Sequence, residues 1–174
     1  MYEEFDPVDK LDEVCALLDK LTVKYEVHYH DEGEFSFLAD GEVSIKVPDP
    51  YIDRIMFIDL QGEFSLYFGE EWHDHYYYDN DGFQDLCDTI KGIINNEMCS
   101  TAVFYGEDLK WGGSWLSVNG DKIREFCSGY YVSTMSNHID EYKKDWAHKK
   151  TYSELRFKFW DPQYDRTVTV KKGS

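Results

Sequence analysis

Residues 54–78 read RIMFIDLQGEFSLYFGEEWHDHYYY, and this stretch decides which fold the chain forms. It contains two apolar runs on either side of Gln61-Gly62 and a third, aromatic run from about Trp72 to Tyr78. Runs of this length that are bounded by turn residues are typical of β-strands, and short connections join antiparallel neighbours. The stretch therefore predicts a three-stranded antiparallel meander.

Segments on both sides of this stretch add further strands. Residues 23–30, VKYEVHYH, alternate strictly and predict a half-buried strand that directs Val23, Tyr25, Val27 and Tyr29 to one face. Residues 33–48 predict two short strands around the turn signal Ala39-Asp40-Gly41. We also expect strands at 100–107 and 112–118, which would pair, and a hairpin at 152–172 that turns at Asp161-Pro162 and directs Leu155, Phe157, Phe159, Val168 and Val170 to the core.

Helices are expected where apolar side chains recur at a spacing of three and four residues. Residues 8–22 predict the first helix, with Asp6 as its N-cap and Pro7 at its first position. Residues 82–98 predict the second, and a short third helix is expected within 138–150. The second helix has candidate caps at Asp79, Asn80 and Asp81 and an apolar stripe of Phe83, Leu86, Cys87, Ile90, Ile93 and Ile94.

Strands that are interrupted by isolated helices indicate an α+β fold. We expect a mostly antiparallel sheet with an N-terminal helix and a central amphipathic helix. The length of 174 residues fits a single domain that spans residues 1–174.

Charge is distributed very unevenly along the chain. The formal net charge is −17, and residues 1–88 hold 24 of the 35 acidic residues but 5 of the 18 basic residues. An acidic surface repels nucleic acid and anionic membranes, because both present phosphates that bind Lys and Arg. It attracts a basic protein and speeds the encounter. We therefore expect a basic protein partner, no nucleic acid and no membrane, although acidity can also serve solubility alone.

Cysteines and terminal sequences bear on the compartment. Cys15, Cys87, Cys99 and Cys127 are scattered without the spacing of a zinc or redox motif, and three of them have apolar neighbours that predict core positions. The acidic N-terminus lacks a signal-peptide pattern, and no apolar run reaches the about 20 residues that span a bilayer. We expect a cytoplasmic protein, and no fingerprint in the sequence predicts a cofactor.

The segment 67–81 combines acidic and aromatic residues more densely than the rest of the chain. Tyr and Trp are favoured at binding surfaces, since they bring large rigid area and a polar tip, and Trp72, Tyr76 and Tyr78 would share a strand face with Asp74. The alternative is that these aromatic side chains pack beneath a helix. No cleft is visible that would set two carboxylates apart for acid–base chemistry, so we predict no catalytic residue. The predicted partner-binding residues are Glu70, Glu71, Trp72, Asp74, Tyr76, Tyr78, Asp79 and Asp81.

Two histidine pairs offer an alternative function. His28 and His30, like His73 and His75, lie two residues apart, so each pair would point to one side of a strand and could share a metal. A four-histidine site would form only if the two strands met on one sheet face. A metal-dependent enzyme therefore stays open as an alternative.

The ordering in residues 66–116, a strand with a Trp-His acidic patch, an amphipathic helix and a strand pair, is similar to that of small uncharacterised bacterial proteins. In size, acidity and expected α+β class the chain also resembles the immunity proteins of bacterial polymorphic toxins and contact-dependent inhibition systems. That resemblance implies a non-enzymatic inhibitor that binds a basic toxin domain, such as a nuclease, and blocks its active surface. A small interaction or scaffold domain with another partner is the third reading.

Overall fold

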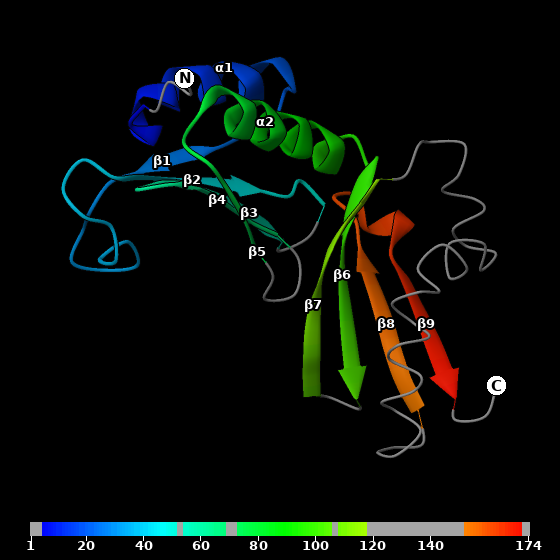
Figure 1. Ribbon diagram of the computed structural model, residues 1–174. Coiled ribbons are helices and arrows are strands. Elements are labelled where there is room, and N and C mark those ends of the chain that lie inside the picture. Colours follow the sequence, from blue (N-terminus) through cyan, green and yellow to red (C-terminus); the bar gives the residue numbers. More distant parts are fainter. Residues whose placement is uncertain (1–4, 52–53, 69–72, 106–107, 118–151, 172–174) are drawn as a thin grey trace.

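The computed structural model describes residues 5–51, 54–68, 73–105, 108–117 and 152–171. In these ranges the chain forms two antiparallel sheets, two α-helices and short 3-10 turns (Figure 1). The predicted α+β class, the N-terminal helix and the central helix are confirmed.

The first sheet is a meander whose strands follow one another in sequence order, β1-β2-β3-β4-β5. Every neighbouring pair is antiparallel. The meander predicted from residues 54–78 is thus present, and its third strand is shorter than expected. The strands are β1 (Glu26–His28), β2 (Val43–Pro48), β3 (Ile55–Leu60), β4 (Phe64–Tyr67) and β5 (His73–Tyr76).

Both helices lie on the same face of this sheet (Figure 1). The first begins as a 3-10 turn, η1 (Pro7–Lys10), and continues as α1 (Leu11–Lys20), while α2 spans Asn80–Ile94. The predicted caps are present, because Asp6 Oδ1 accepts from Val8 N (3.2 Å) and Asp79 Oδ1 accepts from Gly82 N (2.8 Å). Each cap satisfies a backbone N–H that has no partner within the helix.

The core fills the space between the helices and the sheet. Val14 and Leu18 of α1 and Leu86, Ile90 and Ile93 of α2 are fully buried. Each such side chain stabilises the fold by about 1.5–3 kcal/mol relative to an exposed position. The strands supply Val43, Ile45, Val47, Met56, Ile58, Leu60, Phe64 and Leu66 to the same cluster.

A second sheet of four strands continues from the first, in the order β7-β6-β8-β9. The predicted pair and the predicted C-terminal hairpin are both found, with a short 3-10 turn, η3 (Pro162–Tyr164), at Asp161-Pro162. Trp160 joins the main core, and its ring lies 5.8 Å from that of Phe68. The strands are β6 (Met98–Tyr105), β7 (Asp108–Ser117), β8 (Tyr152–Lys158) and β9 (Arg166–Lys171).

One predicted strand is wrong. Residues 33–38 form turns, because Asp31 Oδ1 accepts hydrogen bonds from the backbone N–H groups of Gly33 (2.8 Å) and Phe35 (2.9 Å). This local bonding competes with a strand ladder. β2 therefore pairs with β1, and the expected hairpin around residues 39–41 is absent.

Other predictions are met in part. Val23, Tyr25 and Val27 pack against the core as expected, whereas Tyr29 lies beyond the end of β1 and is exposed. Among the residues predicted at the core from the C-terminal hairpin, Phe157 and Phe159 are buried. Cys87 and Cys99 are buried and Cys15 is half-buried. The helix predicted within 138–150 and Cys127 lie outside the described residues. No helix in the described ranges has the length and hydropathy needed to cross a membrane.

Candidate functional site

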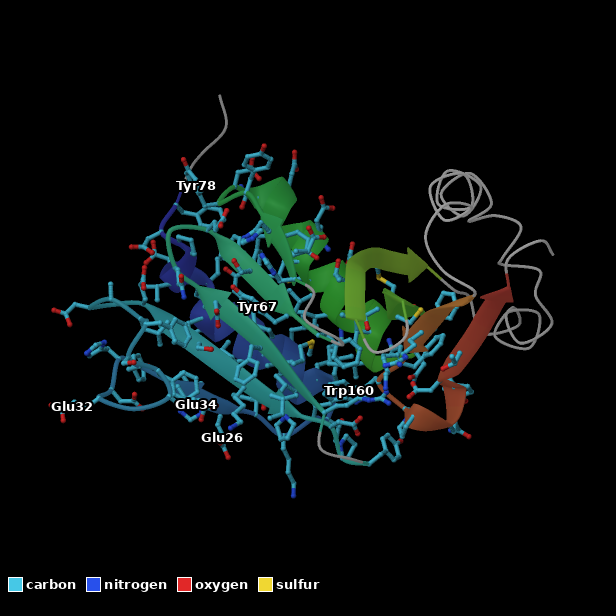
Figure 2. All side chains as sticks on the ribbon, turned by 90° about the horizontal axis from the view of Figure 1, so that it is seen from below. Glu26, Glu32, Glu34, Tyr67, Tyr78 and Trp160 are labelled. Carbon is cyan, nitrogen blue, oxygen red and sulfur yellow. The ribbon has the colours of Figure 1, made fainter. Side chains whose placement is uncertain are left out.

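The face of the first sheet opposite α1 and α2 carries charged and polar side chains, and we call it the open face. Directly opposed residues of antiparallel strands point to the same face, so the register defines two rows of side chains across all five strands. Figure 2 views the sheet from this side, with the helices behind it. One row is Glu26, Lys46, Phe57, Tyr67 and His73, and the other is His28, Ser44, Asp59, Ser65 and His75.

The second row places a buried carboxylate at the middle of the sheet. Asp59 is 4% exposed, and its Oδ1 accepts a hydrogen bond from Ser44 Oγ (2.6 Å). Burial raises the pKa of Asp59, the hydrogen bond from Ser44 lowers it by a smaller amount, and the nearby charge of Glu42 raises it. None of the ion pairs among the described residues includes Asp59.

A pocket of about 280 Å³ lies above this carboxylate, between the sheet and the loop 29–42. The loop is held against the sheet, because the Phe35 ring stacks on His28 at 4.0 Å and His30 Nδ1 lies 2.6 Å from the Leu38 carbonyl oxygen. Burial raises the pKa of Tyr67, and the charge of Asp59 adds to the shift. The pocket is lined by Glu34, Phe35, Phe37, Phe57, Asp59 and Tyr67.

Carboxylates surround the open face. Glu26, Glu34 and Glu63 each expose half or more of their side chains. In Figure 2 Glu26 and Glu34 lie close together at one margin of the sheet, and Tyr67 lies nearer its middle. Lys46 is a basic side chain of this face, and its Nζ lies 3.7 Å from Glu34 Oε2. The face therefore presents an excess of negative charge.

The histidine pairs do not meet. β1 and β5 are the two edges of the sheet, so His28 lies four strand spacings, about 19 Å, from the nearer residue of the other pair. His30 lies beyond the end of β1. His73 and His75 share the open face, with ring centroids 4.6 Å apart. Across the described residues no group of three or more His, Cys, Asp and Glu side chains is placed to hold a metal, so the predicted four-histidine set is not assembled.

Two serines of the open face have acidic or histidine neighbours, but neither arrangement matches a nucleophile with its base. Ser44 is fully buried and donates directly to a carboxylate. Ser65 Oγ lies 3.0 Å from His75 Nδ1, and Glu63 Oε1 lies 2.7 Å from the same nitrogen. A relay would place serine and carboxylate on opposite nitrogens of the ring. These contacts position side chains and do not assemble a catalytic triad.

The predicted partner-binding residues divide among different surroundings. Asp74 and Tyr76 lie on the helix-covered face, opposite Leu66 and Phe64, and Tyr76 packs against the core with its pKa raised by burial. Asp79 caps α2, and Asp81 is exposed in its first turn. Glu70, Glu71 and Trp72 lie outside the described residues. Tyr76 therefore follows the alternative interpretation, in which the aromatic side chains pack beneath a helix.

Tyr78 lines a different hollow at the end of the sheet. This second pocket, of about 490 Å³, is bounded by η1, the turn 39–42 and the turn 60–62. Asp6, Asp40 and Glu42 make it acidic, and the Tyr78 carbonyl oxygen accepts from Phe5 N (3.2 Å). Among the predicted binding residues that the structure describes, Tyr78 combines exposure with a hollow surface.

Asp59, Phe35, Phe37, Phe57 and Tyr67 were not among the residues singled out from the sequence. Asp59 has a visible signal, because it is the single charged residue in the apolar strand IMFIDL. Its opposition to Ser44 depends on the β2–β3 register, which the sequence does not reveal. Comparison with protein-family models, with curated proteins and with solved structures finds no match to this chain.

Proposed function

We propose that this chain is a non-enzymatic binding protein that neutralises a basic bacterial toxin in the cytoplasm by direct contact, as immunity proteins do. The observation that supports this most is the coincidence of acidity and hollow surface on the open face. Both helices cover the other face, and the open face combines a carboxylate rim with an aromatic pocket. Such a surface favours a cationic partner over nucleic acid or a membrane.

The acidic first half is expected to steer the encounter. Complementary charge raises association rates more than it raises affinity, and salt screens the effect. A toxin whose active surface is basic, such as a nuclease that binds phosphates, would be blocked by a carboxylate surface in the same position. The acidic residues of the segment 70–81 (Glu70, Glu71, Asp74, Asp79 and Asp81) are a second candidate contact, and lysine replacements at Glu70, Glu71 and Asp74 test it through association kinetics.

Growth of a host that expresses the gene immediately upstream of this one tests the function. We expect the neighbouring product to stop growth when expressed alone and growth to recover when this chain is co-expressed. A catalytically inactive mutant of the neighbour should still co-purify with this chain, because protection by binding needs no turnover. A harmless neighbour, or rescue without any complex, would contradict the proposal. In the first case a scaffold role with another partner becomes the better reading.

A further inference from the structure

The pocket on the open face contains a buried carboxyl group that forms no ion pair with any described residue. Asp59 exposes only 4% of its surface. Its Oδ1 accepts a hydrogen bond from the Ser44 hydroxyl. Its other oxygen, Oδ2, has no hydrogen-bond partner among the described residues, and Asp59 lines the pocket. A buried carboxylate is unfavourable unless it is paired, so this position calls for a cationic partner group.

Aromatic rings form most of the remaining lining. Phe35, Phe37, Phe57 and Tyr67 surround the space over Asp59, with the Phe35 and Phe37 ring centroids 6.2 Å apart. Aromatic faces attract cations, and the attraction grows when the cation leaves water. The lining thus suits a group that is positively charged and also tolerates an apolar surrounding.

The pocket is preformed, because contacts within the chain hold its lining residues in place. Asp31 fixes the turn that carries Glu34 and Phe35, and Phe35 is stacked on His28. Lys46, a basic side chain on the same face, pairs with Glu34 on the rim and not with Asp59. A preformed site loses little conformational freedom on binding.

We propose that this pocket receives one arginine side chain of the basic protein partner, with its guanidinium against the Asp59 carboxylate. This inference rests on the proposed function and names the contact at its centre. Arginine fits better than lysine because a planar guanidinium stacks on aromatic rings and gives up its hydration more readily than an ammonium group. A hard metal ion would need six or more oxygen ligands, whereas the side chains that line the pocket offer the carboxylates of Glu34 and Asp59 and the hydroxyl of Tyr67. An apolar group would leave the carboxylate unpaired.

Titration of the isolated chain with N-acetyl-arginine amide tests the proposal, followed by NMR of the aromatic rings and methyl groups. N-acetyl-citrulline amide is the matched probe, since it keeps the shape of arginine and lacks the charge. We expect saturable shifts at the pocket within about 50 mM arginine probe, as suits a single side chain, and at least about tenfold weaker binding of the citrulline probe. Equal binding of both probes, tighter binding of N-acetyl-lysine amide, or no shift in this range would overturn the assignment.

Variants locate the effect. Asp59→Asn keeps an acceptor for Ser44 and removes the charge, so it should weaken arginine binding at least about tenfold. Asp12→Asn removes the same charge from the exposed side of α1 and should leave binding unchanged. Tyr67→Leu removes an aromatic wall without touching the carboxylate and should weaken binding as well. Unchanged affinity in Asp59→Asn or in a folded Tyr67→Leu would contradict the proposal.

The titration tests the pocket and the growth assay tests the proposed function, so a negative result in one does not imply a negative result in the other. A chain that binds the arginine probe but gives no protection has a basic partner that is not a toxin. A chain that protects the host but ignores the probe binds its toxin through another surface, and the pocket proposal is then wrong while the proposed function stands.

Discussion

Asp59 is the residue at which burial and charge oppose each other most clearly. Removal from water raises its pKa, while the Ser44 hydroxyl stabilises the ionised form and lowers it by less. The native state therefore binds a proton at Asp59 more tightly than the unfolded chain does. The contribution of Asp59 to stability is greatest at acidic pH and declines as pH rises above the ordinary aspartate value of 3.8.

Asp59→Asn should remove this pH dependence. We expect the free energy of unfolding of the variant to exceed that of the wild type at pH 7 by on the order of 1 kcal/mol, and the gap to close below about pH 4. Urea unfolding at several pH values measures the gap. Asp12→Asn, at an exposed position, should show no such trend. A wild type that is more stable than Asp59→Asn at neutral pH would show that an unrecognised cation already neutralises the carboxylate.

The amino-acid sequence alone did not indicate that Asp59 would be buried in a pocket. The charged residue in IMFIDL could equally have faced solvent, and its partner Ser44 lies 15 residues earlier in the chain. The histidine pairs were conspicuous in the sequence but lie at opposite edges of the sheet. Spacing within one strand is local information, whereas the meeting of two strands is decided by the whole sheet.

At the scale of elements, Gly82 shows how closely the start of α2 approaches the chain that precedes it. A Cβ at this position would lie 2.8 Å from Tyr77 N and would also overlap the Tyr77 carbonyl oxygen, both of them backbone atoms. An alanine normally favours a helix over glycine by about 1 kcal/mol. The overlap should outweigh that preference because backbone atoms cannot move aside as a flexible side chain can.

We therefore expect Gly82→Ala to lower the free energy of unfolding by about 1–3 kcal/mol. Gly62→Ala is the matched control, since its Cβ would meet nothing within 4 Å, and it should change stability by less than about 0.5 kcal/mol. Thermal or chemical denaturation of the two variants gives the comparison. A stabilised Gly82→Ala variant would mean that the junction between β5 and α2 relaxes freely.

Helices were easier to predict than strands. The caps Asp6 and Asp79 and the apolar stripe of α2 are determined within a few residues, and all were found. The strand expected at residues 33–38 failed because Asp31 bonds to the backbone two and four residues later. Phe35 of that segment stacks on His28 instead of taking part in a strand.

At the scale of the whole molecule, Arg54 joins the two sheets. It lies just before β3, and its Nη1 donates to Asp165 Oδ1 (2.9 Å) and to the carbonyl oxygen of Phe159, while its Nη2 donates to Asp165 Oδ2. The Arg54 side chain is 13% exposed, so water competes weakly for these bonds. Two parallel bonds to one carboxylate also fix the orientation of the turn between β8 and β9.

Arg54→Met should lower the free energy of unfolding by about 2–3 kcal/mol, because it removes the guanidinium that binds both oxygens of the partly buried Asp165 carboxylate. Arg54→Lys should recover only part of this loss, since lysine cannot form the two parallel bonds. Lys91→Met breaks the exposed pair with Asp88 and should change stability by less than about 1 kcal/mol. Similar losses in Arg54→Met and Lys91→Met would show that the Arg54 contact does not hold the sheets together.

The sequence predicted the charge distribution and the fold class better than the arrangement of the strands. The excess of acidic residues in the first half and the α+β class were visible in the sequence. The division of the strands into two sheets, and the choice of which face the helices cover, depend on contacts between distant segments. Ile45, Ile58 and Leu66 face the helices because the register aligns them, and the same register directs Ser44 and Asp59 to the open face.

The measurement that tests the central claim most directly is the association rate with the product of the upstream gene at several salt concentrations. Three exposed acids of the open face (Glu26, Glu34 and Glu63) are replaced by glutamine in one variant. Three exposed acids of the helices (Asp12, Asp19 and Asp85) are replaced by asparagine in another, with the same change in net charge. We predict that the open-face variant associates at least about tenfold more slowly with a weaker salt dependence, while the helix variant stays close to the wild type. Equal slowing of both variants, or slowing of the helix variant alone, would contradict the claim that the partner binds the open face.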